Sequence, residues 1–147
     1  MSTSAEQRLE LELHQFSVTG VVAIPNGTDL FHWTATIEGP SGSPYTGGLY
    51  KVKIDFPIDY PNCQPSIRFD PPLYHPNVDQ SSGVPYLPIL NNWTPSNMMS
   101  MVLRNLRNLL SHPDMDHPVD AEIAELYNDD KNEFAKIASD LSLGISQ

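Results

Sequence analysis

Cysteine and basic residues are both scarce in this chain of 147 residues. Its one cysteine, Cys63, cannot form a disulfide within the chain, and paired-cysteine metal sites are excluded as well. Only eight lysine and arginine residues accompany 18 aspartate and glutamate residues, so the formal net charge is −10. Because such a surface repels polyanions, we expect neither nucleic acid nor a membrane as a partner.

Long apolar runs are also missing. The sequence has no run of about 18 apolar residues that would span a membrane, and residues 1–6 contain no apolar stretch typical of a signal peptide. We therefore expect a protein of the cytoplasm, the nucleus or both. A length of 147 residues falls within the range of one domain, so we predict a single domain over residues 1–147.

Helical and strand periodicities alternate along the chain and predict an α+β fold. Residues 4–16 are typical of an amphipathic helix that begins at the cap Ser4, with Leu11 facing solvent. Arg8 and Glu12 form an i, i+4 pair, worth a few tenths of a kcal/mol (about 0.2–0.5). The predicted buried side of this helix consists of Leu9, Leu13 and Phe16.

Alternation with a period of two then predicts an antiparallel meander with one buried face. Its four strands are expected at residues 21–25, 31–38, 50–56 and 66–70, with a proline-rich turn at 57–65. Residues 71–94 contain five prolines and no periodicity, and a long irregular segment in a compact domain is usually functional. A helix from Asn97 to His112 follows, and then two shorter helices at 120–128 and 130–142, the first of them capped by Asp120.

Many short blocks of the sequence resemble the ubiquitin-conjugating enzyme family, in family order, over residues 4–145. They include Phe31-His32-Trp33, Ser43-Pro44-Tyr45-Thr46-Gly47-Gly48, His75-Pro76-Asn77, Trp93-Thr94-Pro95 and Glu122-Ile123-Ala124. The resemblance implies the family's fold, with an N-terminal helix, a four-strand antiparallel meander, a central helix and two C-terminal helices. It also implies thioester chemistry, in which a cysteine thiolate receives ubiquitin and passes it to a lysine amine.

The nucleophile of that reaction is missing. The family's cysteine lies in a Gly-x-Ile-Cys-Leu-Asp-Ile-Leu run, and the corresponding residues 83–90 place Tyr86 at the cysteine position. Pro88 stands where the family has an acidic residue, and His117 stands where a small acidic or polar residue often gates the incoming lysine. Three altered functional positions indicate natural loss of catalysis rather than a single designed substitution.

Two motif residues, His75 and Asn77, are retained. In active relatives the asparagine amide is credited with stabilising the oxyanion of the thioester or with ordering the surrounding loop. Without a thioester the first role is void, so we favour the alternative that both side chains hydrogen-bond the irregular backbone.

Other reactive groups offer alternatives to complete loss of activity. A phenol of pKa ~10 makes Tyr86 a feeble nucleophile for an ester, and Cys63 is more simply a free thiol without a role than a new acceptor. A polar loop of two histidines and two aspartates could hold a metal, but such loops are more often solvated, and we predict neither a metal nor a cofactor. Those four residues are His112, Asp114, Asp116 and His117.

Surfaces that bind partners in the family are altered too. The first helix keeps only Arg8 of its basic residues, and Leu11 replaces another, which disfavours docking of an activating enzyme. Asn62 stands where many members have an anchoring aromatic residue for ligases, and Ser96 stands where many have alanine. Trp93 remains and is more typical of packing than of contact.

A further surface candidate is Val22, an apolar residue on the outer face of the meander, where some relatives bind ubiquitin non-covalently. We therefore interpret the chain as a catalytically inactive ubiquitin-conjugating-enzyme-like protein that binds or regulates. Its expected partners are ubiquitin or a ubiquitin-like modifier, an active conjugating enzyme or a ligase. A divergent transferase with an unusual acceptor residue and a structural subunit unrelated to ubiquitin are the alternatives.

Overall fold

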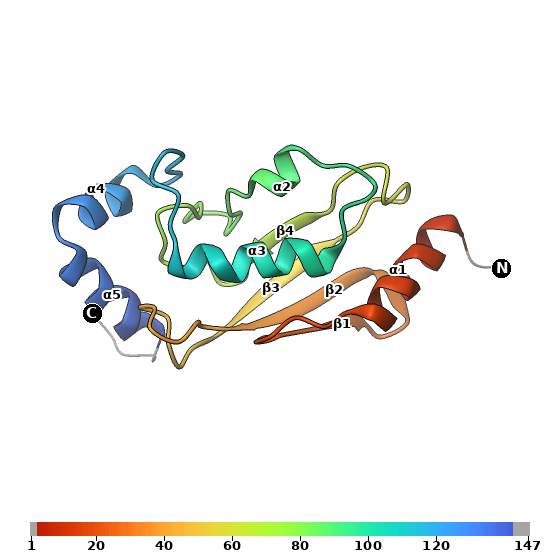
Figure 1. The fold of residues 1–147 in the computed structure, drawn as a ribbon, viewed down its shortest axis with the longest axis horizontal. Helices are drawn as coiled ribbons and strands as arrows, with labels where there is room; N and C mark the ends of the chain where they lie inside the picture. Colours follow the sequence, from red (N-terminus) through yellow and green to blue (C-terminus); the bar gives the residue numbers. More distant parts are fainter. Residues whose placement is uncertain (1–2, 143–147) are drawn as a thin grey trace.

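The computed structural model describes residues 3–142 of the chain. A first helix, α1 (Ser4–Gln15), precedes a four-stranded antiparallel sheet in the order β1-β2-β3-β4 (Figure 1). The strands are β1 (Val21–Asn26), β2 (Asp29–Glu38), β3 (Leu49–Asp55) and β4 (Ser66–Phe69). Four helices follow: α2 (Pro88–Asn91), α3 (Met99–Ser111), α4 (Ala121–Asp129) and α5 (Lys131–Ser142). The predicted α+β meander is confirmed.

The core lies between the sheet and α3, which runs across one sheet face in Figure 1. Alternate residues of the central strands are buried there, and Ala35 of β2 pairs with Val52 of β3 at the centre. The apolar side of α3 covers them with Val102, Leu103, Leu106, Leu109 and Leu110. Because strand side chains alternate between the faces, the polar and charged residues between these positions line the opposite face.

The start and end of α1 differ from the prediction. Thr3, not Ser4, caps the helix, because its hydroxyl accepts a bond from the Glu6 amide at 3.1 Å. The Glu6 carboxylate accepts the Thr3 amide in return, also at 3.1 Å, which completes a capping box. The helix ends at Gln15, and Phe16 follows it as a half-buried cap residue.

Glu12 is buried, whereas the energy given above for its pair with Arg8 applies to an exposed pair on a helix surface. Its side chain is buried, and its carboxylate accepts bonds from the Arg8 guanidinium at 2.8 Å and from the Met99 amide at 2.7 Å. It also accepts the Tyr60 hydroxyl. A buried carboxylate with three donors ties α1 to the 57–65 turn and to the start of α3, so a few tenths of a kcal/mol (about 0.2–0.5) understates its contribution.

The region expected to be irregular, residues 71–94, contains one short helix, α2, which begins at Pro88. The rest is held by turns, and Gly83 fixes one of them against β4. Gly83 has a φ of +82°, and a Cβ there would lie 2.0 Å from the Phe69 carbonyl oxygen. Within residues 3–142, no helix is both long and apolar enough to cross a membrane.

Candidate functional site

Tyr86, at the position of the family's nucleophile, is placed by backbone pairing. Val78 and Pro85 form an isolated antiparallel bridge, and the Tyr86 amide donates to the Asn77 carbonyl at 2.8 Å. Two short extended segments therefore lie side by side, and Tyr86 stands next to the His75-Pro76-Asn77 motif.

The Asn77 side chain is fully buried and fully engaged. Its amide nitrogen donates to the carbonyls of Asp114 at 2.7 Å and of His117 at 3.0 Å, and its oxygen accepts the Asp114 amide at 2.8 Å. An asparagine amide has two N–H groups, and both have a backbone partner here. In this conformation Asn77 orders the loop after α3 and has no free donor for an oxyanion.

The His75 ring is buried and also bonds the backbone. Its Nε2 donates to the Leu109 carbonyl at 2.8 Å, and its Nδ1 accepts the Asn77 amide at 3.0 Å. This pattern requires the neutral ring, because a protonated Nδ1 cannot accept. Burial, which disfavours the charged form, lowers the pKa of His75 from 6.5 to about 4, although the bond to Leu109 opposes the shift.

An aromatic pair occupies the predicted place of the reactive groups. The rings of Tyr86 and His117 are stacked, with centroids 4.8 Å apart and planes inclined by 17°. Nδ1 of His117 lies 3.1 Å from a carboxylate oxygen of Asp114, whose backbone is held by Asn77. The two positions that the resemblance assigns to nucleophile and gate therefore contact each other. The third, Pro88, is exposed at the first position of α2.

Cys63 lies in the 57–65 turn, at the opposite end of the sheet from the loop after α3 (Figure 1). It is exposed, and its thiol donates to the Asp59 carboxylate at 3.1 Å. That hydrogen bond and the negative charge of Asp59 raise the pKa of the thiol. Since the thiolate is the nucleophile, Asp59 makes Cys63 less reactive.

The polar loop after α3 contains the four residues weighed above as alternative metal ligands. Asp114 and His117 contact each other, but within residues 3–142 no group of three or more His, Cys, Asp or Glu side chains is arranged to hold a metal ion.

Of the predicted partner residues on α1, Arg8 is half-buried and engaged, since it also donates to the Asn97 carbonyl at 2.7 Å. Leu11 is 50% exposed, as the helical periodicity predicts. On the outer sheet face, Val22 is 64% exposed, and its neighbour Ile24 is 59% exposed. Ile24 was missed, although it shares a face with Val22 by the same period of two.

The surface predicted to dock ligases combines one half-buried aromatic residue with exposed polar and apolar side chains. Trp93 is half-buried, donates from its indole nitrogen to the Pro61 carbonyl at 2.8 Å, and packs on Tyr60. Asn62 and Ser96 are exposed beside it. Ile58 in the same turn, which no periodic pattern marks, is 84% exposed.

The fold, together with the His75-Pro76-Asn77 region, is that of a ubiquitin-conjugating type of domain. The family model for ubiquitin-conjugating enzymes matches residues 5–142, so the chain belongs to that family.

Two solved structures are similar over nearly the whole chain. One is the conjugating-enzyme domain of a Toxoplasma gondii ubiquitin conjugating enzyme, with 31% identity, a TM-score of 0.88, and coverage of 96% of this chain and 98% of that one. The other is a Plasmodium yoelii protein assigned as a ubiquitin-conjugating enzyme, with 32% identity, a TM-score of 0.91, and coverage of 100% and 98%.

Proposed function

We propose that this chain is a catalytically inactive member of the ubiquitin-conjugating enzyme family that acts by binding, as a regulatory module in the transfer of ubiquitin or a related modifier. The observation that carries the proposal is the stacked pair of Tyr86 and His117 at the place of the family's nucleophile and gate. A tyrosine phenol is a far weaker nucleophile than a cysteine thiolate and offers no comparable acceptor for a thioester.

The remaining groups support the same proposal. Both amide N–H groups of Asn77 donate to carbonyls of the loop after α3. Stabilisation of an oxyanion by this side chain would therefore require that loop to open. The thiol of Cys63 is at the other end of the sheet, with a raised pKa. Neither Asn77 nor Cys63 therefore substitutes for the missing cysteine nucleophile.

As partners we propose ubiquitin or a ubiquitin-like modifier, together with an active conjugating enzyme or a ligase. The neighbouring exposed side chains of Val22 and Ile24 on the outer sheet face supply an apolar contact for such a partner. We propose the cytoplasm or nucleus as its compartment, consistent with a single free thiol.

A charging assay tests the loss of activity. The chain is incubated with activating enzyme, ubiquitin and ATP beside an active conjugating enzyme, and the products are separated with and without reductant. We expect no adduct while the control is charged. A reductant-sensitive adduct that disappears in Cys63→Ser would overturn the proposal, and so would a reductant-stable adduct that disappears in Tyr86→Phe.

A binding measurement tests the regulatory part. Isotope-labelled protein is titrated with unlabelled ubiquitin, and amide shifts are followed by NMR. We expect shifts over β1 and β2 that weaken in Val22→Asp and Ile24→Asp but persist in Leu141→Asp, which places the same charge on another exposed apolar residue. Absence of shifts with ubiquitin and with an active conjugating enzyme would contradict the proposed partners.

A further inference from the structure

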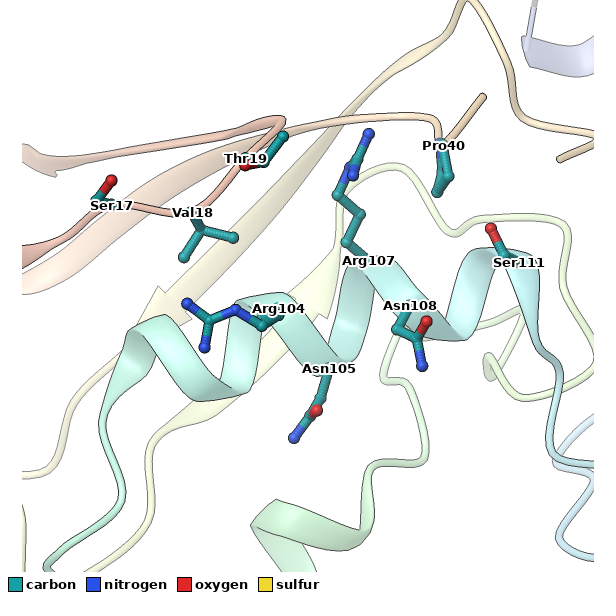
Figure 2. A pocket seen from close by; sticks show the side chains of 9 residues that line it. All are labelled: Ser17, Val18, Thr19, Pro40, Arg104, Asn105, Arg107, Asn108 and Ser111. Atoms are coloured by element: carbon teal, nitrogen blue, oxygen red, sulfur yellow. The ribbon is translucent and has the colours of Figure 1, made fainter. Parts of the chain in front are cut away.

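A polar groove of about 540 Å³ lies between the loop at residues 17–19 and the exposed side of α3 (Figure 2). Ser17 and Thr19 border it on one side, and Asn105 and Asn108 border it on the helix. These hydroxyl and amide groups can donate hydrogen bonds to an acceptor placed in the groove.

The groove differs in charge from the rest of the molecule. The chain has 18 acidic residues and a formal net charge of −10, yet none of the aspartates or glutamates within residues 3–142 lines this groove. Two of the chain's eight basic residues, Arg104 and Arg107, line it together. A local positive site on an acidic protein attracts a negatively charged group at short range, within about one Debye length.

Neither arginine is neutralised by a carboxylate. Arg8 pairs with Glu12 and Arg68 with Asp70, whereas in the described part of the chain Arg104 and Arg107 have no such ion pair.

Arg107 is fixed in place, while Arg104 is open to solvent. Nε of Arg107 donates to the Glu38 carbonyl at 2.9 Å, and its guanidinium lies so close to Gly20 that a Cβ there would come within 2.5 Å of Nε. The two terminal nitrogens of Arg107 keep their donors for a ligand. Arg104 is exposed, and within residues 3–142 its guanidinium has neither a hydrogen bond nor an ion pair.

Figure 2 shows the two arginine side chains reaching different sides of the loop, Arg104 below Val18 and Arg107 between Thr19 and Pro40. Two separate anchors fit an extended ligand with two negative groups better than one compact anion. We propose that this groove binds an acidic segment of a partner protein, with one carboxylate side chain on Arg104 and a second on Arg107.

Charge and shape favour a peptide as the occupant. A nucleic acid would bring a continuous row of phosphates against a molecule of net charge −10, whereas a short acidic segment places its charges only in the groove. Arginine forks bind carboxylates in a bidentate manner, and clusters of them recognise acidic motifs.

Fluorescence anisotropy with a labelled peptide tests the proposal. The probe is a ten-residue alternating Glu-Ser peptide, and its control is the Gln-Ser peptide of the same length. We expect the acidic peptide alone to bind, about fivefold more weakly to Arg104→Gln and about 20-fold more weakly to the Arg104→Gln/Arg107→Gln double variant, and more weakly as salt rises. Because Arg104 is exposed and unpaired, Arg104→Gln is a test that does not depend on folding.

A Lys131→Gln/Lys136→Gln variant removes the same charge from α5 and should bind as the unmodified chain does. Equal weakening in that variant would overturn the proposal, since binding would then reflect net charge alone. Equal binding of the Gln-Ser peptide, or no binding of the acidic peptide at low salt, would overturn it as well. Full displacement by inorganic phosphate at constant ionic strength would indicate a single-anion site and refute the two anchors.

The proposal does not depend on the inactivity of the chain. If the charging assay detected an adduct, the proposal that the groove binds an acidic segment would still stand. If the acidic peptide did not bind, the proposal that the chain is inactive would still stand.

Discussion

The buried His75 predicts that the folded protein loses stability between pH 6.5 and pH 4. Its pKa is about 4 in the folded chain because burial disfavours the charged ring, against an ordinary value of 6.5 when the chain is unfolded. Between these two values the unfolded state binds a proton that the folded state does not. Stability is therefore complete above pH 6.5, falls as the pH is lowered, and has lost this contribution at about pH 4.

The size of the effect follows from the two pKa values. One unit of difference in pKa corresponds to about 1.4 kcal/mol, so His75 contributes about 3 kcal/mol across the interval. The steepest slope is about 1.4 kcal/mol per pH unit, near the middle of the interval. Hydrogen bonds lower the pKa values of Asp29 and Asp79 from their ordinary value of 3.8. Their effect on stability therefore falls mainly below the interval in which His75 titrates.

Urea unfolding followed by tryptophan fluorescence, repeated from pH 7 to pH 4.5, measures this slope. His75→Gln removes the titrating ring and should flatten the dependence, whatever its effect on absolute stability. His14→Gln, at an exposed histidine in the last turn of α1, should keep the dependence of the unmodified chain. An unchanged slope in His75→Gln, or an NMR titration of the His75 ring with a midpoint near 6.5, would refute the reasoning.

Three further substitutions test contacts that support the fold and the site. Glu12→Gln should lower the free energy of unfolding by about 2–4 kcal/mol, because a buried carboxylate loses its charge beside three donors. A loss below about 0.5 kcal/mol in urea unfolding would contradict that burial. Asn77→Ala should cost about 2 kcal/mol and speed hydrogen exchange at the Asp114 amide, and unchanged exchange would argue against the observed bonds. Gly83→Ala should destabilise by at least about 1 kcal/mol more than Gly42→Ala, which has a similar positive φ but open space around it. Equal effects on urea unfolding would mean that the close approach to β4 is unimportant.

Periodicity predicted the sheet and the long helices because β2, β3 and α3 each bury one face. Their apolar residues recur at the spacing of that face, so a local pattern carries the information. The burial of Glu12, by contrast, could not be predicted from periodicity. Its donors Tyr60 and Met99 are 48 and 87 residues away in sequence, so no local pattern indicates that its carboxylate is buried.

The candidate site was only partly predictable for the same reason. The motif and the missing cysteine are readable in the sequence, but the bonds of Asn77 reach residues 37 and 40 positions away. The contact between Tyr86 and His117 joins two irregular loops, so no periodic pattern in the sequence predicts it. One overlooked signal was local: Pro88 is suited to the first position of a helix and indicates the start of α2.

The same hydrogen bonds explain how a chain can keep this motif without its nucleophile. His75 and Asn77 act through their side chains, which bond the end of α3 and the loop beyond it, so their replacement would disturb the fold. Tyr86 is held through its backbone, because its amide donates to the Asn77 carbonyl whatever side chain the residue bears. A change of side chain at position 86 leaves this backbone bond in place, whereas a change at His75 or Asn77 removes side-chain bonds to the end of α3 and the loop beyond it. The motif residues therefore support the local fold, whereas the bond at position 86 places no demand on its side chain.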